Sequence, residues 1–237
     1  MEAQSVPARQ KILETQELPP LPHVAAELLT LLQAEDEEEL ERLRHLVEQD
    51  PGLTARVMGW ANSAYFGTRG NVRNLDRAIF GVLGLRPVTS LLLSILLNRA
   101  FDPRACPAFQ LEDYWFRALL TAHCARSAGQ RATEPRLDPE DAFLAGLLHK
   151  FGLLLLVHLF PDGMDSAFQA VGSPDDAALR AAETTRVGID HAQAGAWLAR
   201  RWHLPEMVVD TISAYTQSPP PPDRPVAGVV GLSRSQV

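Results

Sequence analysis

The sequence predicts an all-α protein, and three observations support this fold class. Apolar residues recur at the three- and four-residue spacing of a helix surface, as Leu53, Val57, Trp60 and Ala61 do. Helix start signals recur along the chain, most clearly where an aspartate precedes a proline. No stretch of useful length alternates apolar and polar residues as a half-buried strand does, and no internal repeat is present.

The helices of the N-terminal half are placed by their start signals. Pro22 suits the first turn of one helix, because a proline there loses no intrahelical hydrogen bond. Asp36 can cap the next helix, with Glu39 as its capping-box partner, and Asp50 and Pro51 supply a capping carboxylate and a proline at the first helical position of the one after. Asn74 can cap a short helix, and the segment 86–101 is apolar on nearly all sides. We therefore expect 86–101 to be a central, buried helix.

The C-terminal half is expected to contain further helices, separated by short loops. Their expected ranges are 111–128, 138–149, 153–159, 176–185, 190–202 and 204–215. We expect the run from Phe160 to Gly163, which contains Pro161, to break the apolar helix before it. The four prolines of 219–222 predict an extended tail, and 226–232 is expected to form a short terminal helix.

Composition narrows the functional classes. The chain has 237 residues, 46% of them hydrophobic, and a formal net charge of −7, which disfavours a general nucleic-acid binder because such proteins carry a basic face. Cys106 and Cys124 form no CxxC pair, so neither a disulfide framework nor a thiolate metal site is indicated. No signal peptide is evident, and the longest apolar cluster, 91–97, is too short to span a bilayer. A cytoplasmic protein that is not bound to membranes is expected.

Several motifs occur in a fixed order along the chain. They are Leu18-Pro19-Pro20-Leu21-Pro22, Asp50-Pro51-Gly52-Leu53-Thr54-Ala55-Arg56, Ala61-Asn62-Ser63-Ala64-Tyr65-Phe66-Gly67, Ala78-Ile79 with Leu83-Gly84, Tyr114-Trp115, Ala145-Gly146-Leu147-Leu148-His149, and Gly188-Ile189-Asp190-His191 leading to Trp202-His203-Leu204-Pro205-Glu206. With these motifs, residues 18 to 215 resemble the HDOD domain, a helical relative of the HD-domain phosphohydrolases found in bacterial signalling proteins.

The resemblance implies a two-lobed helical HDOD fold. The N-terminal helical lobe would cover about 18–104, and a C-terminal HD-like bundle about 111–215. Residues 1–17 would be a flexible N-terminus, and 216–237 a Pro-rich tail with a short terminal segment. The family is generally regulatory and non-catalytic, so the resemblance implies a signalling role. We also expect a groove between the two lobes, since ligand sites favour such junctions.

The resemblance also identifies the place where an HD enzyme would hold its metal. In those enzymes a histidine is followed directly by an aspartate, whereas here Lys150 follows His149. An ammonium has three hydrogen-bond donors and no lone pair for a metal. His191 matches a further histidine of the pattern, but a later histidine pair would fall near Ala214 and Tyr215. The early ligand and the late aspartate have no counterpart either, and two imidazoles are fewer than the three protein ligands that catalytic sites keep.

Three interpretations of His149, Lys150 and His191 remain open. We favour buried, hydrogen-bonded histidines that are remnants of the site and pack between helices. Alternatively, the vacated pocket, with all three residues, binds an anion or a nucleotide without cleaving it, since Lys150 is a better phosphate partner than an aspartate. For Lys150 alone we favour a solvent-exposed side chain at a helix end. A surviving metal site is the third interpretation.

The expected function is a catalytically inert signal-transduction module without metal or cofactor. It would act by binding a protein partner of a signalling pathway or a small ligand, with a nucleotide or an anion as the candidate chemistry. The alternative is a residual metal-dependent phosphohydrolase acting on a nucleotide or a cyclic dinucleotide. Binding to membranes or nucleic acid is not expected.

Overall fold

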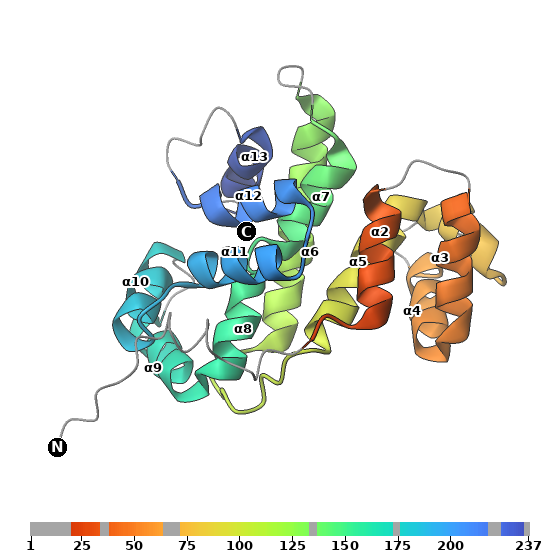
Figure 1. Ribbon diagram of the computed structural model, residues 1–237. Coiled ribbons are helices and arrows are strands. Elements are labelled where there is room, and N and C mark those ends of the chain that lie inside the picture. Colours follow the sequence, from red (N-terminus) through yellow and green to blue (C-terminus); the bar gives the residue numbers. More distant parts are fainter. Residues whose placement is uncertain are drawn as a thin grey trace. The chain divides into compact units, whose positions relative to one another are not determined.

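The computed structural model describes residues 20–33, 38–63, 72–132, 137–172, 176–217 and 224–234. All regular elements in these ranges are helices, which confirms the predicted all-α class (Figure 1). The chain divides into two compact units, one formed by 21–97 and the other chiefly by 98–237. The expected flexible N-terminus, the expected cap Asp36, the aromatic pair Tyr65 and Phe66, and the proline run 219–222 lie outside the described residues.

The first unit consists of five helical elements around a small apolar core. They are α2 (His23–Gln33), α3 (Glu38–Gln49), α4 (Pro51–Ala61), the π-helix η2 (Arg77–Leu83) and most of α5 (Leu85–Asn98). Leu28, Leu43 and Val57 are fully buried in this unit. The π-helical form of η2 was not expected from the sequence, which predicts only a short helix there.

Polar side chains hold the turns of the first unit, as the sequence predicts for two of them. Asp50 caps α4 by accepting hydrogen bonds from the N–H groups of Gly52 (2.8 Å) and Leu53 (3.2 Å). Asn74 caps the following helix through the N–H of Arg77 at 2.8 Å. Asn62 exchanges two hydrogen bonds with the backbone of Val72, so it joins two points of the chain ten residues apart.

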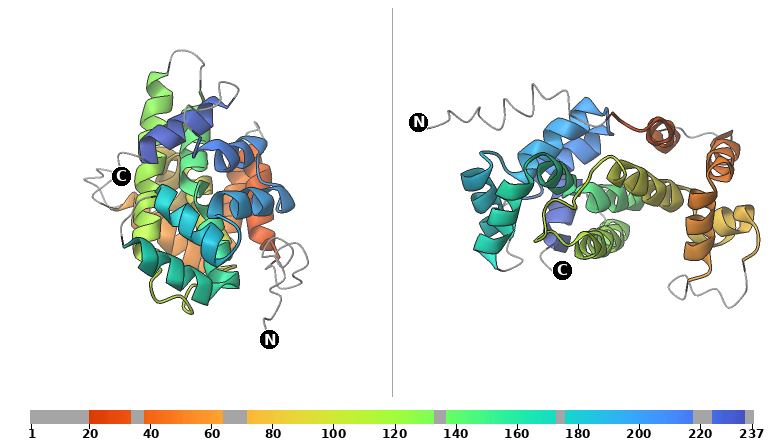
Figure 2. Two further views of the ribbon diagram at one scale, coloured as in Figure 1. Left: turned by 90° about the vertical axis from the view of Figure 1, so that its left-hand side faces the viewer. Right: turned by 90° about the horizontal axis from the view of Figure 1, so that it is seen from below.

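The second unit contains the remaining helices, whose packing Figure 2 shows from two further sides. They are α6 (Leu111–Arg131), α7 (Pro139–Leu148), α8 (Phe151–Leu159), α9 (Pro161–Val171), α10 (Asp176–Arg186), α11 (His191–Arg201), α12 (Glu206–Ala214) and α13 (Pro225–Arg234). The long α6 packs along α7, α8 packs on α11, and α9 lies beside α10. The C-terminal α13 packs on α6, α7 and α12.

The helix α9 corrects one prediction. We expected the run from Phe160 to Gly163 to break the helix and placed no helix before residue 176. The break is real, but it is one residue long, because Pro161 occupies the first turn of α9. Burial of Met164 and Ala167 holds this helix in place, and it ends at Gly172 in the left-handed conformation with φ 57°.

Two glycines explain how closely α8 and α11 approach one another. A Cβ atom on Gly152 would overlap the carbonyl oxygen of His191 and lie 2.5 Å from the amide nitrogen of Gly195. Gly195 is equally restricted, because its Cβ would lie 2.9 Å from the amide nitrogen of Gly152. Backbone therefore touches backbone at this crossing, which brings the first residue of α11 next to the junction of α7 and α8.

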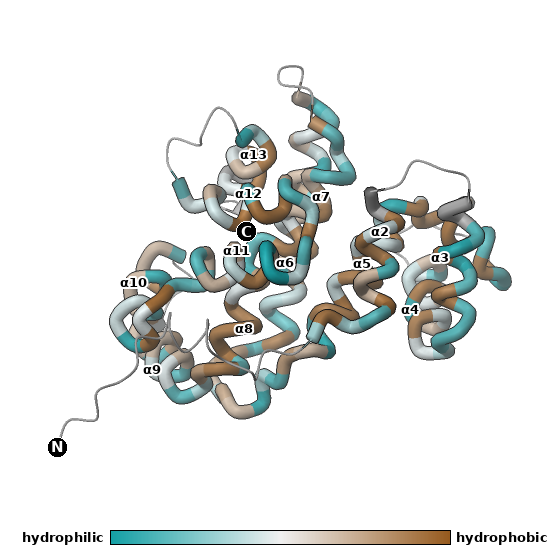
Figure 3. Tube along the Cα trace, in the orientation of Figure 1, coloured by the Kyte–Doolittle hydropathy of each residue, from teal (hydrophilic) through white to brown (hydrophobic). Residues whose placement is uncertain are grey.

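The α7–α8 stretch is also the most apolar part of the described chain. Pro139–Leu159 is long and apolar enough to cross a membrane by length and composition, but 83% of its most apolar window is buried inside the protein. In Figure 3 the hydrophobic colour runs along most of α8. Residues 151–157 are all buried. This burial is what the core helices of a globular bundle show.

Candidate functional site

His149 lies at the junction between α7 and α8, inside the second unit. Asp138 caps α7 and Pro139 occupies its first turn, as predicted, and the helix ends at His149. The imidazole is only 2% exposed, and its Nδ1 lies 2.7 Å from the carbonyl oxygen of Gly146. A carbonyl can only accept, so Nδ1 carries the proton and donates it. The prediction of a buried, hydrogen-bonded histidine is confirmed for this residue.

The other ring nitrogen of His149 is an acceptor without a donor. Nε2 is buried and has no hydrogen-bond partner among the described residues. The ring packs edge-on against the ring of Tyr215, with 5.1 Å between centroids and 88° between planes. Burial, assisted by the neighbouring Lys150 charge, lowers the pKa of His149 to about 3, so the imidazole is neutral near pH 7.

His191, the first residue of α11, is held by a buried carboxylate. Its side chain is completely buried, and Nδ1 lies 2.8 and 2.9 Å from the two carboxylate oxygens of Glu183, which is also completely buried. The backbone N–H of His191 donates to Glu183 as well, at 2.8 Å. On the far side of the ring, Nε2 lies 2.7 Å from the hydroxyl of Tyr215. This second histidine therefore also matches the predicted buried, hydrogen-bonded state.

The charge of Glu183 decides the protonation of His191. Burial by itself would lower the pKa of this imidazole, but the attraction of Glu183 and the nearby Asp176 carboxylate outweighs burial and raises the pKa. A protonated imidazole donates through both nitrogens, which matches the two polar neighbours that the ring has. The surroundings therefore favour the neutral form of His149 and the protonated form of His191, although the two rings lie close together.

Lys150 is paired with a residue that sequence analysis did not identify. Its Nζ lies 2.8 Å from Oδ1 of Asp176 at the start of α10, and its side chain is 24% exposed. This position differs from the solvent-exposed side chain that we favoured. Burial would raise the pKa of Asp176, but hydrogen bonding from His191 and the charge of Lys150 hold this pKa far below its usual range. Asp176 is therefore a permanent carboxylate facing both cations.

The cluster extends one step further through Arg180. Its guanidinium lies 3.5 Å from Asp176 and 3.8 Å from Asp190, the residue that caps α11. Six ionisable groups thus form one network, which we call the charged cluster. Its members are Lys150, Asp176, Arg180, Glu183, Asp190 and His191. With His191 protonated the cluster has three positive and three negative charges, so its net charge is zero.

The structure brings together all three residues predicted for the site, but their neighbours were missed. Tyr215 was considered only as a position where a histidine is lost, yet its buried ring lies between His149 and His191. Asp176, Arg180 and Glu183 follow the spacing i, i+4, i+7 on α10, which places three charged side chains on one helix face. A charged stripe on a helix that must pack against others was the signal available in the sequence.

The donor set does not fit a divalent metal of the kind that HD-type enzymes use. Within the described ranges, no group of three His, Cys, Asp or Glu side chains is placed to hold a metal ion. The carboxylate of Asp176, 3.6 Å from Nε2 of His191, is already paired with the ammonium of Lys150 at 2.8 Å. A cation placed beside Asp176 would have to displace that ammonium or accept its repulsion.

The two histidines should change the free energy of unfolding in opposite directions as the pH rises, which gives the pH profile a rising limb and a falling limb. From about pH 3 to 6.5 the unfolded chain protonates His149 and the folded chain does not, so the free energy of unfolding rises with pH. Above pH 6.5 the folded chain keeps a proton on His191 that the unfolded chain loses, so this free energy falls. Each limb contributes at most about 1.4 kcal/mol per pH unit.

Urea unfolding at half-unit pH steps measures both limbs. Because surface carboxylates also titrate in acid, the informative quantity is the difference between the wild type and His149→Gln. The variant should lose part of the acid slope and keep the alkaline slope. Equal slopes below pH 6.5 in both proteins would show that His149 is not held neutral in the folded state.

Comparisons with known proteins agree with this architecture. The family model of the HDOD domain matches residues 18–218. A protein of Marinobacter aquaeolei VT8, named "Putative signal transduction protein", has a crystal structure with a TM-score of 0.80 and 30% identity, covering 92% of this chain and 48% of that one. An HDOD domain protein with unknown function from Geobacter sulfurreducens has a TM-score of 0.80 at 23% identity, covering 97% of this chain and 76% of that one.

Two further relatives complete the comparison. A crystal structure from Shewanella amazonensis SB2B, named "Putative phosphohydrolase", has a TM-score of 0.74 and 28% identity, covering 98% of this chain and 80% of that one. An uncharacterized protein of Treponema pallidum (strain Nichols) is 26% identical over 223 residues, which are 93% of this chain and 42% of that protein. This chain therefore spans less than half of that relative and of the Marinobacter protein. The match over 18–218 shows that the chain belongs to the HDOD domain family.

Proposed function

We propose that this chain is a cytoplasmic, catalytically inert regulatory module that acts by binding a protein partner in a signalling pathway. The observation that carries the proposal is the ion pair between Lys150 and Asp176, at 2.8 Å beside His191. In this pair the ammonium, which belongs to the chain itself, balances the charge of the carboxylate that lies beside His191. The cluster then needs no exchangeable ion to be electrically neutral.

Two other groups support the same proposal. Glu183 engages Nδ1 of His191, and the hydroxyl of Tyr215 lies 2.7 Å from Nε2, so both nitrogens of this histidine have partners within the chain. The ring of Tyr215 also packs against His149. A hydrolytic metal centre needs open coordination positions for water and substrate. The polar groups around His191 are instead occupied with one another.

A signalling role is supported by the family and by the name of the Marinobacter relative. Partners of the longer relatives do not transfer directly, because this chain covers only part of their length. Nucleic acid is not the proposed partner, since a net charge of −7 disfavours general binding to a phosphate backbone. A protein captured reproducibly by the wild type, and released by substitutions on one surface patch, would identify the partner.

The test of inertness is a comparison of metal binding and turnover. We expect the wild type, purified without chelator, to contain no stoichiometric metal and to leave bis(p-nitrophenyl) phosphate uncleaved with added Mn²⁺. Lys150→Asp should bind Mn²⁺ at least about tenfold more tightly than the wild type. It removes the ammonium and places a second carboxylate beside Asp176 and the unpartnered Nε2 of His149.

Lys150→Ala is the matched control, because it removes the ammonium without adding a ligand. Calorimetric titration of the three proteins with Mn²⁺ separates the contributions of charge and of coordination. Stoichiometric metal in the wild type, with turnover that disappears in His149→Ala, would overturn the proposal and favour a metal-dependent phosphohydrolase.

A further inference from the structure

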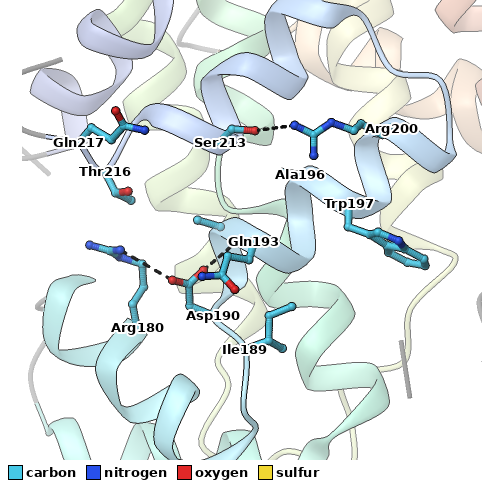
Figure 4. A pocket seen from close by; sticks show the side chains of 11 residues that line it. Arg180, Ile189, Asp190, Gln193, Ala196, Trp197, Arg200, Ser213, Thr216 and Gln217 are labelled. Atoms are coloured by element: carbon cyan, nitrogen blue, oxygen red, sulfur yellow. Dashed lines mark hydrogen bonds and ion pairs between the residues drawn. The ribbon is translucent and has the colours of Figure 1, made fainter. Parts of the chain in front are cut away.

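A pocket of about 570 Å³ lies beside the charged cluster, within the second unit (Figure 4). One side is the surface of α11, and the others are Arg180 of α10 and the end of α12 around Ser213 and Gln217. Its volume falls in the range of small-molecule sites, which is about 300–1,000 Å³. It is separate from the position of His149, which does not line it.

Two arginines give this pocket its chemistry. Arg180 and Arg200 both line it, and in Figure 4 the guanidinium of Arg200 reaches toward Ser213 while that of Arg180 is paired with Asp190. Within the described part of the chain, the Arg200 guanidinium makes one polar contact, a long hydrogen bond of 3.4 Å to the hydroxyl of Ser213. Within the described residues it has no carboxylate partner. A guanidinium presents paired donors that match a phosphate or a carboxylate, so an anion is the partner that Arg200 lacks.

Among the described residues that line the pocket, Asp190 is the one acidic residue, and its carboxylate already has partners. Its carboxylate accepts the N–H of Gln193 at 2.8 Å as the cap of α11, and it lies 3.8 Å from Arg180. The lining therefore contains two positive charges and one negative charge. A local positive excess in a chain of net charge −7 favours an anionic ligand at this place.

The surface of α11 also supplies an aromatic ring in register with Arg200. Gln193, Trp197 and Arg200 have the spacing i, i+4, i+7, which places them in one row on the helix. The indole of Trp197 is half-buried, and the guanidinium of Arg201 already lies over one of its faces at 5.8 Å from the ring centroid, so a base would stack on the opposite face. The polar groups of Gln193 and Thr216 are available for hydrogen bonds.

We propose that this pocket binds a nucleoside phosphate, with the phosphate on Arg200 and the base against Trp197. Three features support this ligand class: an arginine without a carboxylate partner among the described residues, an aromatic side chain one turn away, and amide and hydroxyl groups in the same pocket. This inference goes beyond the proposed function, because it assigns a ligand site that neither metal binding nor a protein partner requires. It also places the ligand outside the cluster formed by His149, Lys150 and His191.

The site is connected to the charged cluster through Arg180. The same guanidinium lies 3.5 Å from Asp176 and 3.8 Å from Asp190, so it belongs to both the pocket and the cluster. A phosphate in the pocket attracts Arg180 and weakens its hold on Asp176. Binding at the surface therefore changes the electrostatic environment of His191, which lies 3.6 Å from Asp176.

The test is a calorimetric titration of the whole chain with four probes: GMP, AMP, ribose 5-phosphate and guanosine. We expect at least one of the two nucleotides to bind more tightly than either fragment, because only the nucleotides contact both Arg200 and Trp197. Arg200→Ala should weaken that binding at least about tenfold, as loss of a charge-assisted hydrogen bond does. Arg186→Ala is the control, because Arg186 is exposed on α10 and does not line the pocket.

Each result supports or overturns the proposal. Weakening by Arg200→Ala and by Trp197→Ala, with Arg186→Ala unchanged, supports it. Ribose 5-phosphate binding as tightly as the nucleotides, or equal affinities in the wild type and Arg200→Ala, overturns it. No binding of any probe at millimolar concentration also overturns it. An NMR titration of the His191 ring protons with GMP provides a second readout, in which a ligand-induced shift that disappears in Arg180→Lys shows the connection.

Discussion

Replacing Glu183 with alanine is expected to cost about 3–5 kcal/mol of stability, the usual effect of removing one partner of a buried ion pair. Glu183 and His191 are both 0% exposed, and three hydrogen bonds at 2.8–2.9 Å join them. The alanine variant leaves a buried imidazole, a buried backbone N–H and a cavity. Urea denaturation at pH 7, followed by circular dichroism, measures the loss.

Two further variants show whether charge or volume is responsible. Glu183→Gln keeps the shape and one acceptor oxygen but removes the charge, so it should cost less and should lower the pKa of His191 in an NMR titration. Glu41→Ala removes a carboxylate that is 77% exposed and should change stability by less than about 0.5 kcal/mol. If Glu183→Ala is no more harmful than Glu41→Ala, the buried pair contributes no measurable stability.

The substitution Gly152→Ala is expected to cost about 3 kcal/mol, near the upper end for overpacking. The added methyl would overlap the carbonyl oxygen of His191 and lie 2.5 Å from the amide nitrogen of Gly195, and neither backbone atom can rotate away. The helices α8 and α11 must then move apart, which also displaces His191 from Tyr215. Thermal unfolding should show a decrease in Tm of roughly 6–12 °C.

Gly59 provides the matched control for this substitution. It lies in α4, and a Cβ there would meet nothing within 4 Å. Gly59→Ala should therefore leave stability unchanged or raise it by about 0.5–1 kcal/mol, because alanine is the better helix former. Comparable Tm values for Gly152→Ala and the wild type would contradict the tight crossing of α8 and α11.

Sequence reasoning located most helices because their signals are local. The caps at Asp50, Asn74 and Asp138 each act on a backbone N–H two or three residues away, so a short window contains both donor and acceptor. The α9 helix was missed because a proline after an apolar run is compatible with both a break and a new first turn. The choice depends on whether Met164 and Ala167 find a core, which is a tertiary property.

The candidate site was only half predictable for the same reason. His149, Lys150 and His191 could be found from motif positions, but Asp176 lies 26 residues after Lys150 and its partners are set by how α10 packs. No local pattern determines which carboxylate reaches an ammonium at that separation. Tyr215 shows a related difficulty, because a lost histidine says nothing about what the replacing side chain contacts.

The ion pair between Lys150 and Asp176 also limits the evolutionary routes open to this chain. A substitution of Lys150 by aspartate removes one positive charge, adds one negative charge and leaves two carboxylates facing each other beside His191. Without a metal ion, the protein with aspartate at position 150 is less stable than the present chain and less stable than a protein in which Asp176 has also been replaced. The effect of the change at position 150 therefore depends on residue 176. Substitutions at these two positions should therefore be epistatic, and lineages that acquire the lysine should rarely lose it alone.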